Sequence, residues 1–234
     1  MTKSVAIITA RGGSKRIPRK NIKNFLGKPI IAYSIAAALE AGCFDEVMVS
    51  TDDAEIASVA ASFGATVPFL RSVESSNDFA TTADVLVEVL TEYSKIGRPF
   101  DYACCIYPTA PFVTPRKLKQ GYDLLTTTGA DSAFPVVRFG YPIQRALQIQ
   151  NNCLSMIQPE HMNSRSQDLM PAYHDSGQFY WLRVARFLET RKLFAEHTVP
   201  IEMPESEVQD IDTEEDWKIA EMKYQILSRR SQQG

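Results

Sequence analysis

The chain has few cysteines, no long apolar run and little net charge. No apolar run approaches the length of a membrane span, so no transmembrane helix is predicted. The 25 basic and 28 acidic residues leave a net charge of −3, which gives no general reason to expect nucleic acid or a membrane surface as a partner. Free thiols in such small number are typical of the reducing cytoplasm. The cysteines match no zinc spacing, and two are adjacent within an apolar run: Cys43, Cys104, Cys105 and Cys153.

Two common phosphate-binding motifs are also missing. Neither GxxxxGK[ST] nor GxGxxG occurs, which excludes a P-loop and the dinucleotide-binding fingerprint. Gly12 and Gly13 would let the backbone approach a ligand closely, and Ser14 can donate a hydroxyl. Arginine and lysine bind phosphate oxygens, so this stretch predicts a polyphosphate-binding loop, the alternative being a solvated basic loop. It holds seven cations and no acid between residues 11 and 28: Arg11, Lys15, Arg16, Arg19, Lys20, Lys23 and Lys28.

Short apolar runs alternate with helical patterns along the first half of the chain, which is typical of a three-layer α/β fold with a mostly parallel sheet. Residues 139–175 interrupt this alternation, because they are rich in Gln, Asn, Ser, Tyr and Pro. We predict a single domain, residues 1–234, with residues 139–175 as an insertion. Strands are predicted at Val5–Thr9, Glu46–Ser50, Ala65–Phe69, Tyr102–Tyr107, Asp131–Arg138, Gly177–Val184 and Thr198–Glu202. Helices are predicted at Pro29–Ala41, Asp53–Phe63, Thr82–Ser94, Pro115–Leu125 and from Thr213 onward.

Two pairs of carboxylates are candidates for metal binding. Asp210 and Asp212 stand at alternate positions, so in an extended segment both would point to the same side and could hold a hard divalent cation. The alternative is that Asp212 or Thr213 only caps the last helix. Asp52 and Asp53 follow a predicted strand, and here capping of the next helix is favoured over metal binding.

Several segments resemble the sugar-acid cytidylyltransferases, the family of CMP-sialic acid and CMP-Kdo synthetases. They are ARGGSKRIPRKNIKNFLGKPIIAYSI (10–35), VMVSTDDAEIASVAASFGATVPFLR (47–71), YPTAP (107–111) and QDIDTEEDW (209–217). The resemblance runs nearly the full length and implies a Rossmann-like nucleotidyltransferase fold, with the cationic loop around the triphosphate of CTP. It implies CTP contacts at Arg11, Gly12, Gly13, Ser14, Lys15, Asn21, Arg71, Thr81 and Thr82. It also implies catalytic roles for Arg11, Lys15, Lys20, Asp210 and Asp212, with Asp210 and Asp212 as the Mg²⁺ ligands.

A narrower resemblance lies in the part of the chain expected to contact the sugar. YPIQRAL (141–147), QPEHMNSRSQDL (158–169) and AYHDSGQFYW (172–181) resemble the pseudaminic acid cytidylyltransferases. Tyr107 departs from the sialic acid branch, which tends to have Gln at the matching place and uses it to contact the sugar acid. By resemblance the insertion is a dimerisation arm that can reach into the partner's active site, which implies a homodimer. The sugar contacts implied are Tyr107, Arg165, Gln167 and Gln178.

The resulting hypothesis is an enzyme that converts CTP and a nonulosonic acid, most closely pseudaminic acid, into the CMP-sugar and diphosphate. The alternatives within the family are N-acetylneuraminate, legionaminate and Kdo as the acid. Outside it they are a glycosyltransferase that uses a DxD motif and a nucleotide sensor without turnover. Mg²⁺ is the expected cofactor, and the need for CTP together with free thiols indicates the cytoplasm. RNA binding is not favoured, because interleaved aromatics and overall basicity are lacking.

Overall fold

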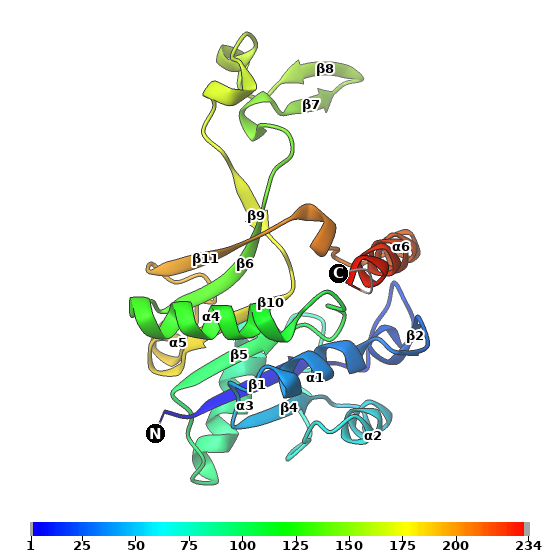
Figure 1. Cartoon of the computed structure of the whole chain (residues 1–234), viewed down its shortest axis with the longest axis vertical. Helices are drawn as coiled ribbons and strands as arrows, with labels where there is room; N and C mark the ends of the chain where they lie inside the picture. The colour runs from blue at the N-terminus through cyan, green and yellow to red at the C-terminus, as the bar shows by residue number, and fades with distance from the viewer. Residues whose placement is uncertain (1, 232–234) are drawn as a thin grey trace.

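The centre of the molecule is one mixed sheet, in a computed structural model that describes residues 2–231 (Figure 1). Six of its seven strands follow the order β11-β6-β10-β5-β1-β4, and β9 pairs with β6. β1 is parallel to β4 and β5, and β11 to β6, whereas β10 is antiparallel to β5 and β6, and β9 to β6. Most of these strands therefore share one direction, which confirms the predicted sheet. The bounds are β1 Ser4–Thr9, β4 Glu46–Ser50, β5 Tyr102–Ile106, β6 Ser132–Arg138, β9 Tyr173–Asp175, β10 Phe179–Arg183 and β11 Thr198–Met203.

Helices cover both faces of the sheet, because alternate residues of the buried strands point to opposite faces. The helices are α1 Ile31–Glu40, α2 Ala54–Ser62, α3 Thr82–Lys95, α4 Pro115–Thr128, α5 Val184–Thr190 and α6 Glu214–Ser231. In β1, Ile8 packs in one cluster with side chains of α1, α2 and α4, and Ile7 packs in another with side chains of α3 and α5. This arrangement confirms the three-layer prediction. No helix in the described part of the chain is long and apolar enough to span a membrane.

The adjacent thiols of Cys104 and Cys105 divide between the same two clusters and are fully buried. Burial raises the pKa of Cys104 well above its ordinary value and that of Cys105 to about 12. A thiol is nucleophilic only as the thiolate, so these two side chains are packing groups.

The predicted strand at Ala65–Phe69 is wrong. Only Thr66 is bridged to β4, with hydrogen bonds from Thr66 N to Val47 O and from Val49 N to Thr66 O, each 2.9 Å. Pro68 has no N–H to donate, so the ladder cannot continue through it. Among the described residues, β4 is consequently the last strand on this side of the sheet.

Residues 139–172 form an arm that projects away from the sheet and returns through β9 (Figure 1). The arm contains a hairpin of β7 Leu147–Gln150 and β8 Cys153–Met156, with short 3-10 helices at Ile143–Arg145, Pro159–His161 and Ser166–Asp168. Exposed apolar side chains gathered in one segment are typical of a surface that another protein covers. Those exposed on the arm are Phe139, Tyr141, Ile143, Leu147, Ile149, Leu154, Ile157, Met162 and Met170.

Asp53 links the basic loop to the start of α2. Its carboxylate accepts hydrogen bonds from the N–H groups of Glu55 and Ile56 at 2.9 and 3.0 Å, so it caps α2 as predicted. It also forms an ion pair with Arg19 of the loop. The hydrogen bond from Arg19, followed by that from the Ile56 N–H, lowers the pKa of Asp53 from its ordinary 3.8 to about 2.

We expect Asp53→Asn to flatten the acid end of the stability profile. A carboxylate whose folded-state pKa is lowered contributes stability above its unfolded pKa, and this contribution is lost as the pH falls through the folded value. Between about pH 4 and pH 2, the wild type should lose about 1–2 kcal/mol more unfolding free energy than Asp53→Asn, which keeps a capping side chain. Urea unfolding at a series of pH values measures this difference, and parallel profiles for the two proteins would contradict it.

Candidate active site

The basic loop, residues 10–23, lies at the edge of the sheet where β1, β4 and β5 end and β10 begins. The carboxyl ends of parallel strands meet at one edge, and the antiparallel β10 brings its amino end to the same edge. Ligands bind at this edge in open α/β sheets. A pocket of about 390 Å³ opens here, lined by Thr9, Arg11, Ser14, Lys15, Arg16, Ile17, Lys20, Asn21, Tyr107, Pro108 and Thr109.

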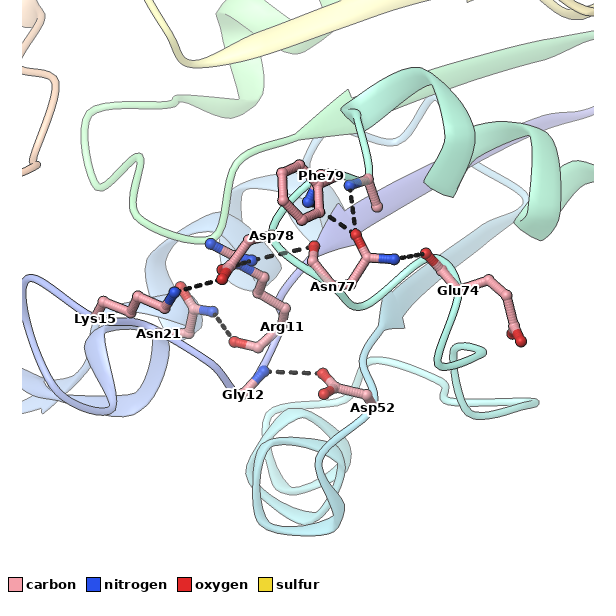
Figure 2. A network of polar contacts seen from close by, with 10 residues as sticks. Arg11, Gly12, Lys15, Asn21, Asp52, Glu74, Asn77, Asp78 and Phe79 are labelled. Carbon is pink, nitrogen blue, oxygen red and sulfur yellow. Dashed lines mark hydrogen bonds and ion pairs between the residues drawn. The ribbon is translucent and has the colours of Figure 1, made fainter.

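Hydrogen bonds hold the backbone of the loop in place. Asn21 is buried, and its Nδ2 donates to Arg11 O at 2.9 Å. Gly12 N donates to Asp52 Oδ1 at 2.9 Å (Figure 2). A Cβ at Gly12 would lie 2.9 Å from Asp53 Oδ2, so a larger residue would push the loop away from α2. Asn21 and Gly12 thus shape the loop, and their predicted contacts with CTP stay predictions.

Arg11 and Lys15 point toward one carboxylate from a later segment of the chain (Figure 2). Arg11 Nη1 lies 3.0 Å from Asp78 Oδ1, and Lys15 pairs with the other carboxylate oxygen. All three side chains keep substantial contact with solvent. The structure therefore brings two of the predicted catalytic cations together around a single anion, an arrangement that suits phosphate oxygens.

Arg16 and Lys20 face the DxD motif near the end of the chain. Arg16 Nη2 lies 2.8 Å from Asp212 Oδ1, and Lys20 Nζ lies 3.6 Å from the same oxygen. Lys20 Nζ also donates a hydrogen bond to Ile211 O at 2.6 Å. Lys20 is therefore fixed beside the two carboxylates, between the loop and the segment that leads into α6.

Asp210 has a raised pKa although the residue is exposed. Desolvation by the surrounding protein is the main cause, and the like charge of Asp212 adds to it, while Lys20 opposes it. A divalent cation would relieve the repulsion between the carboxylates, so the pair fits Mg²⁺ in charge and in oxygen donors. The described residues include no group of three or more His, Cys, Asp or Glu side chains able to hold a metal ion. Phosphate oxygens and water would therefore supply the remaining ligands.

The start of α6 is capped by Thr213 and Asp216. Thr213 N and Oγ1 each donate to Asp216 Oδ2 at 2.8 Å, and Asp216 N donates to Thr213 Oγ1 at 3.2 Å. Of the two capping residues considered, Thr213 has this function and Asp212 does not. The carboxylate of Asp212 is directed instead to the cations of the loop.

The residues expected to contact cytidine line the end of β4 and the start of α3. Arg71 is buried, and it donates from Nε to Ser50 Oγ at 3.0 Å and from Nη2 to Ser50 O at 2.6 Å. Burial lowers the pKa of its guanidinium. Thr81 caps α3 in a reciprocal arrangement with Asp84, and Thr82 Oγ1 lies 3.4 Å from the Tyr107 hydroxyl. These contacts give the three residues structural roles, and their contacts with the nucleotide stay predictions.

Tyr107 stands beside a second tyrosine at the start of β10. Its backbone N–H donates to Gln178 O at 2.9 Å, and its ring centroid lies 5.5 Å from that of Tyr180. The Tyr180 hydroxyl donates to Asp175 Oδ2 at 2.6 Å. Burial, with Tyr107 next in importance, raises the pKa of Tyr180, so this hydroxyl remains a hydrogen-bond donor.

Two buried polar atoms near these tyrosines have no hydrogen-bond partner in the described structure. They are Ser176 Oγ and Gln178 Oε1, on either side of Gly177. Gly177 adopts a positive φ of 63°, and a Cβ there would lie 3.8 Å from Asp210 Cγ. Unsatisfied buried polar groups are rare in native proteins, and each calls for an explanation such as a catalytic role or a bound water or ion. Gln178 was predicted from the sequence as a candidate sugar contact. Ser176 was not predicted as a candidate site residue, because a lone serine gives no signal in the sequence.

The arm holds the other two predicted sugar contacts. Arg165 is exposed and pairs with Asp168, with Nε lying 2.7 Å from Oδ2. Gln167 lies in the short 3-10 helix Ser166–Asp168, within the arm that projects away from the sheet (Figure 1). Neither Arg165 nor Gln167 lines the pocket at the basic loop, so their predicted contacts with the sugar stay predictions.

Comparison with known proteins gives a consistent set of relatives. The chain matches the family model described as Cytidylyltransferase over residues 5–226. It is 43% identical to the pseudaminic acid cytidylyltransferase of Campylobacter jejuni (strain 81-176), over 96% of this chain and 97% of that protein. It is 33% identical to the CMP-N,N'-diacetyllegionaminic acid synthase of Legionella pneumophila, over 95% and 96%. A solved structure of CMP:2-keto-3-deoxy-manno-octonic acid synthetase complexed with CTP matches with a TM-score of 0.69 at 19% identity, over 97% of this chain and 100% of that one.

The chain belongs to the cytidylyltransferase family. It is accordingly a nucleotidyltransferase, and the family predicted from the sequence is confirmed. At 19% identity the solved structure supports a conclusion about the fold alone. It confirms the predicted nucleotidyltransferase fold.

Proposed function

We propose that the chain converts CTP and pseudaminic acid into CMP-pseudaminic acid and diphosphate in the cytoplasm. The observation that carries this proposal is the set of loop cations at one edge of the sheet, where Arg11 and Lys15 pair with Asp78. At the same edge Lys20 lies 3.6 Å from Asp212 Oδ1 and acts on the charge of Asp210. The proteins at 43% and 44% identity, both described as pseudaminic acid cytidylyltransferases, support the choice of substrate.

The proposed reaction is an in-line displacement at the α-phosphorus of CTP. The anomeric hydroxyl of the sugar acid forms the new P–O bond while the bond to the β-phosphate breaks. Such a transfer depends on positioning and charge stabilisation, so Arg11, Lys15 and Lys20 would offset the charge on the departing diphosphate. Asp210 and Asp212 would hold Mg²⁺, which when bound supplies Lewis-acid polarisation of the α-phosphate.

The sugar acid would lie toward Tyr107 and the Ser176–Gln178 turn. The free Oγ of Ser176 and Oε1 of Gln178 offer polar contacts there, and Asp210 borders the same turn. The experiment that tests substrate choice is kcat/KM with pseudaminic, legionaminic, N-acetylneuraminic and Kdo acids, each with CTP and Mg²⁺. Pseudaminic acid should give the highest value. A higher value with another acid would keep the family and overturn the assignment of substrate.

We further propose that the arm joins two chains into a homodimer. The apolar side chains exposed along it, together with the remoteness of Arg165 from its own pocket, support this proposal. Ile149→Asp combined with Leu154→Asp places charges in the hairpin, where the two native side chains are 75% and 65% exposed. Light scattering should show a dimer for the wild type and a monomer for this variant. Ile96→Asp, at an exposed apolar position after α3, is the control and should remain dimeric.

A mixing experiment tests whether Arg165 acts in the partner's site. Arg165→Ala and Lys20→Met should each be nearly inactive as homodimers. If the arm crosses over, mixed dimers contain one site with both native residues, and refolding the two variants together should recover about a quarter of wild-type activity. No recovery on mixing would show that Arg165 does not complete the partner's site.

A further inference from the structure

Asp78 occupies the place where the triphosphate would be held. It pairs with both Arg11 and Lys15, the two loop cations that the proposed reaction assigns to the departing diphosphate. A second pocket of about 570 Å³ lies between the loop and the segment that carries Asp78, and its lining includes Arg11, Lys15, Asn77 and Asp78. A phosphate group cannot pair fully with these cations while the carboxylate remains there.

The backbone around Asp78 is ordered by its neighbour Asn77 (Figure 2). Asn77 Oδ1 accepts hydrogen bonds from Phe79 N at 2.8 Å and Ala80 N at 3.0 Å, and its Nδ2 donates to Glu74 O at 2.7 Å. Arg11 Nη1 also donates to the Asn77 carbonyl oxygen at 3.3 Å. The turn therefore presents the carboxylate to the loop in a defined position.

The ion pairs of Asp78 are weak enough to exchange with a ligand. Its side chain is 44% exposed, and its partners Arg11 and Lys15 are 38% and 76% exposed. Exposed ion pairs contribute little free energy, so a polyphosphate with several negative charges can displace the carboxylate. Hydrogen bonds from Lys15 and then Arg11 lower the pKa of Asp78, so the carboxylate stays charged near neutral pH and available to re-form the pairs.

We propose that Asp78 competes with diphosphate for Arg11 and Lys15 and thereby speeds release of this product. The inference rests on the proposed function, because it assumes that diphosphate is formed against these two cations. Release of product limits turnover in many enzymes. Cations that stabilise the leaving diphosphate also retain it as product, and a competing internal anion would counteract this retention.

The test compares Asp78→Asn with Glu74→Gln, which removes one negative charge from the same segment at a side chain that points away from Arg11 (Figure 2). Titration calorimetry with diphosphate and Mg²⁺ should give a Kd about three- to tenfold lower for Asp78→Asn than for the wild type, and no change for Glu74→Gln. Dissociation of diphosphate, followed by stopped flow, should slow by a similar factor. CMP lacks the β- and γ-phosphates, so its Kd should change much less.

Unchanged diphosphate binding in Asp78→Asn would overturn the inference. Weaker binding would also overturn it, since it would show that Asp78 only holds the loop in shape. If the wild type binds neither CTP nor diphosphate, the proposed function fails and the inference fails with it. If both bind with equal strength to wild type and Asp78→Asn, only the inference fails.

Discussion

Asp210→Asn is expected to lower kcat by about 10²- to 10³-fold, because the Mg²⁺ that Asp210 is proposed to hold would stabilise charge at the α-phosphate, a contribution of several kcal/mol to the transition state. Desolvation, with the like charge of Asp212 next, raises the pKa of Asp210, and Lys20 opposes this rise. Asparagine keeps the shape of the side chain but removes the charge that would attract Mg²⁺. The measurement is steady-state turnover as a function of Mg²⁺ concentration, with CTP and pseudaminic acid saturating.

Binding of CTP without Mg²⁺ separates a metal defect from a folding defect. Asp210→Asn should bind CTP at least as well as the wild type under this condition, since the loop cations remain and one negative charge is gone. Glu215→Gln is the matched control, because it removes an exposed carboxylate in the first turn of α6. Turnover close to wild type in Asp210→Asn, at ordinary Mg²⁺ concentration, would exclude Asp210 as a metal ligand.

Lys20→Met should lower kcat/KM for CTP by about a hundredfold. Lys20 Nζ is fixed by Ile211 O at 2.6 Å and lies 3.6 Å from Asp212 Oδ1, with only 20% of the side chain exposed. Methionine fills most of the same volume but leaves the two carboxylates and the phosphates without this cation. A charge in a partly desolvated pocket is worth more than one in water, so the loss should exceed that for any exposed lysine.

The control for this variant is Lys23→Met. Lys23 belongs to the same basic stretch, but it pairs with Glu214 at 2.7 Å and does not line the pocket. We expect it to stay within about threefold of wild-type kcat/KM, as is usual for an exposed ion pair. Equal losses in Lys20→Met and Lys23→Met would mean that the stretch acts through its total charge and not through a positioned lysine.

Much of the fold could be predicted because buried parallel strands carry continuous apolar runs, as in Val5–Thr9 and Tyr102–Tyr107. The failed strand at Ala65–Phe69 has the same apolar character, but a single proline removes the donor that the ladder needs. The small hairpin of β2 Asn24–Phe25 and β3 Lys28–Pro29 was also missed, because strands this short have no periodicity to detect.

The sequence predicted the cations of the site, but it did not predict which acidic residues face them. A run of basic residues around two glycines is visible in the sequence, whereas its ion-pair partners depend on topology. Asp78 is 67 residues from Arg11 along the chain, and Asp212 is 196 residues from Arg16. Only the convergence of strand ends at one sheet edge brings these groups together. Ser176 escaped detection for a related reason, since its missing partner is a property of the folded interior.

The most direct test of the central claim is ³¹P NMR of the protein with CTP, Mg²⁺ and pseudaminic acid. The account predicts that a CMP phosphodiester and diphosphate appear together in equal amounts, and that neither appears when the sugar acid is omitted. If CTP binds normally but no phosphodiester forms with pseudaminic, legionaminic, N-acetylneuraminic or Kdo acid, the chain is a nucleotide-binding protein without this activity, and the proposed function is wrong.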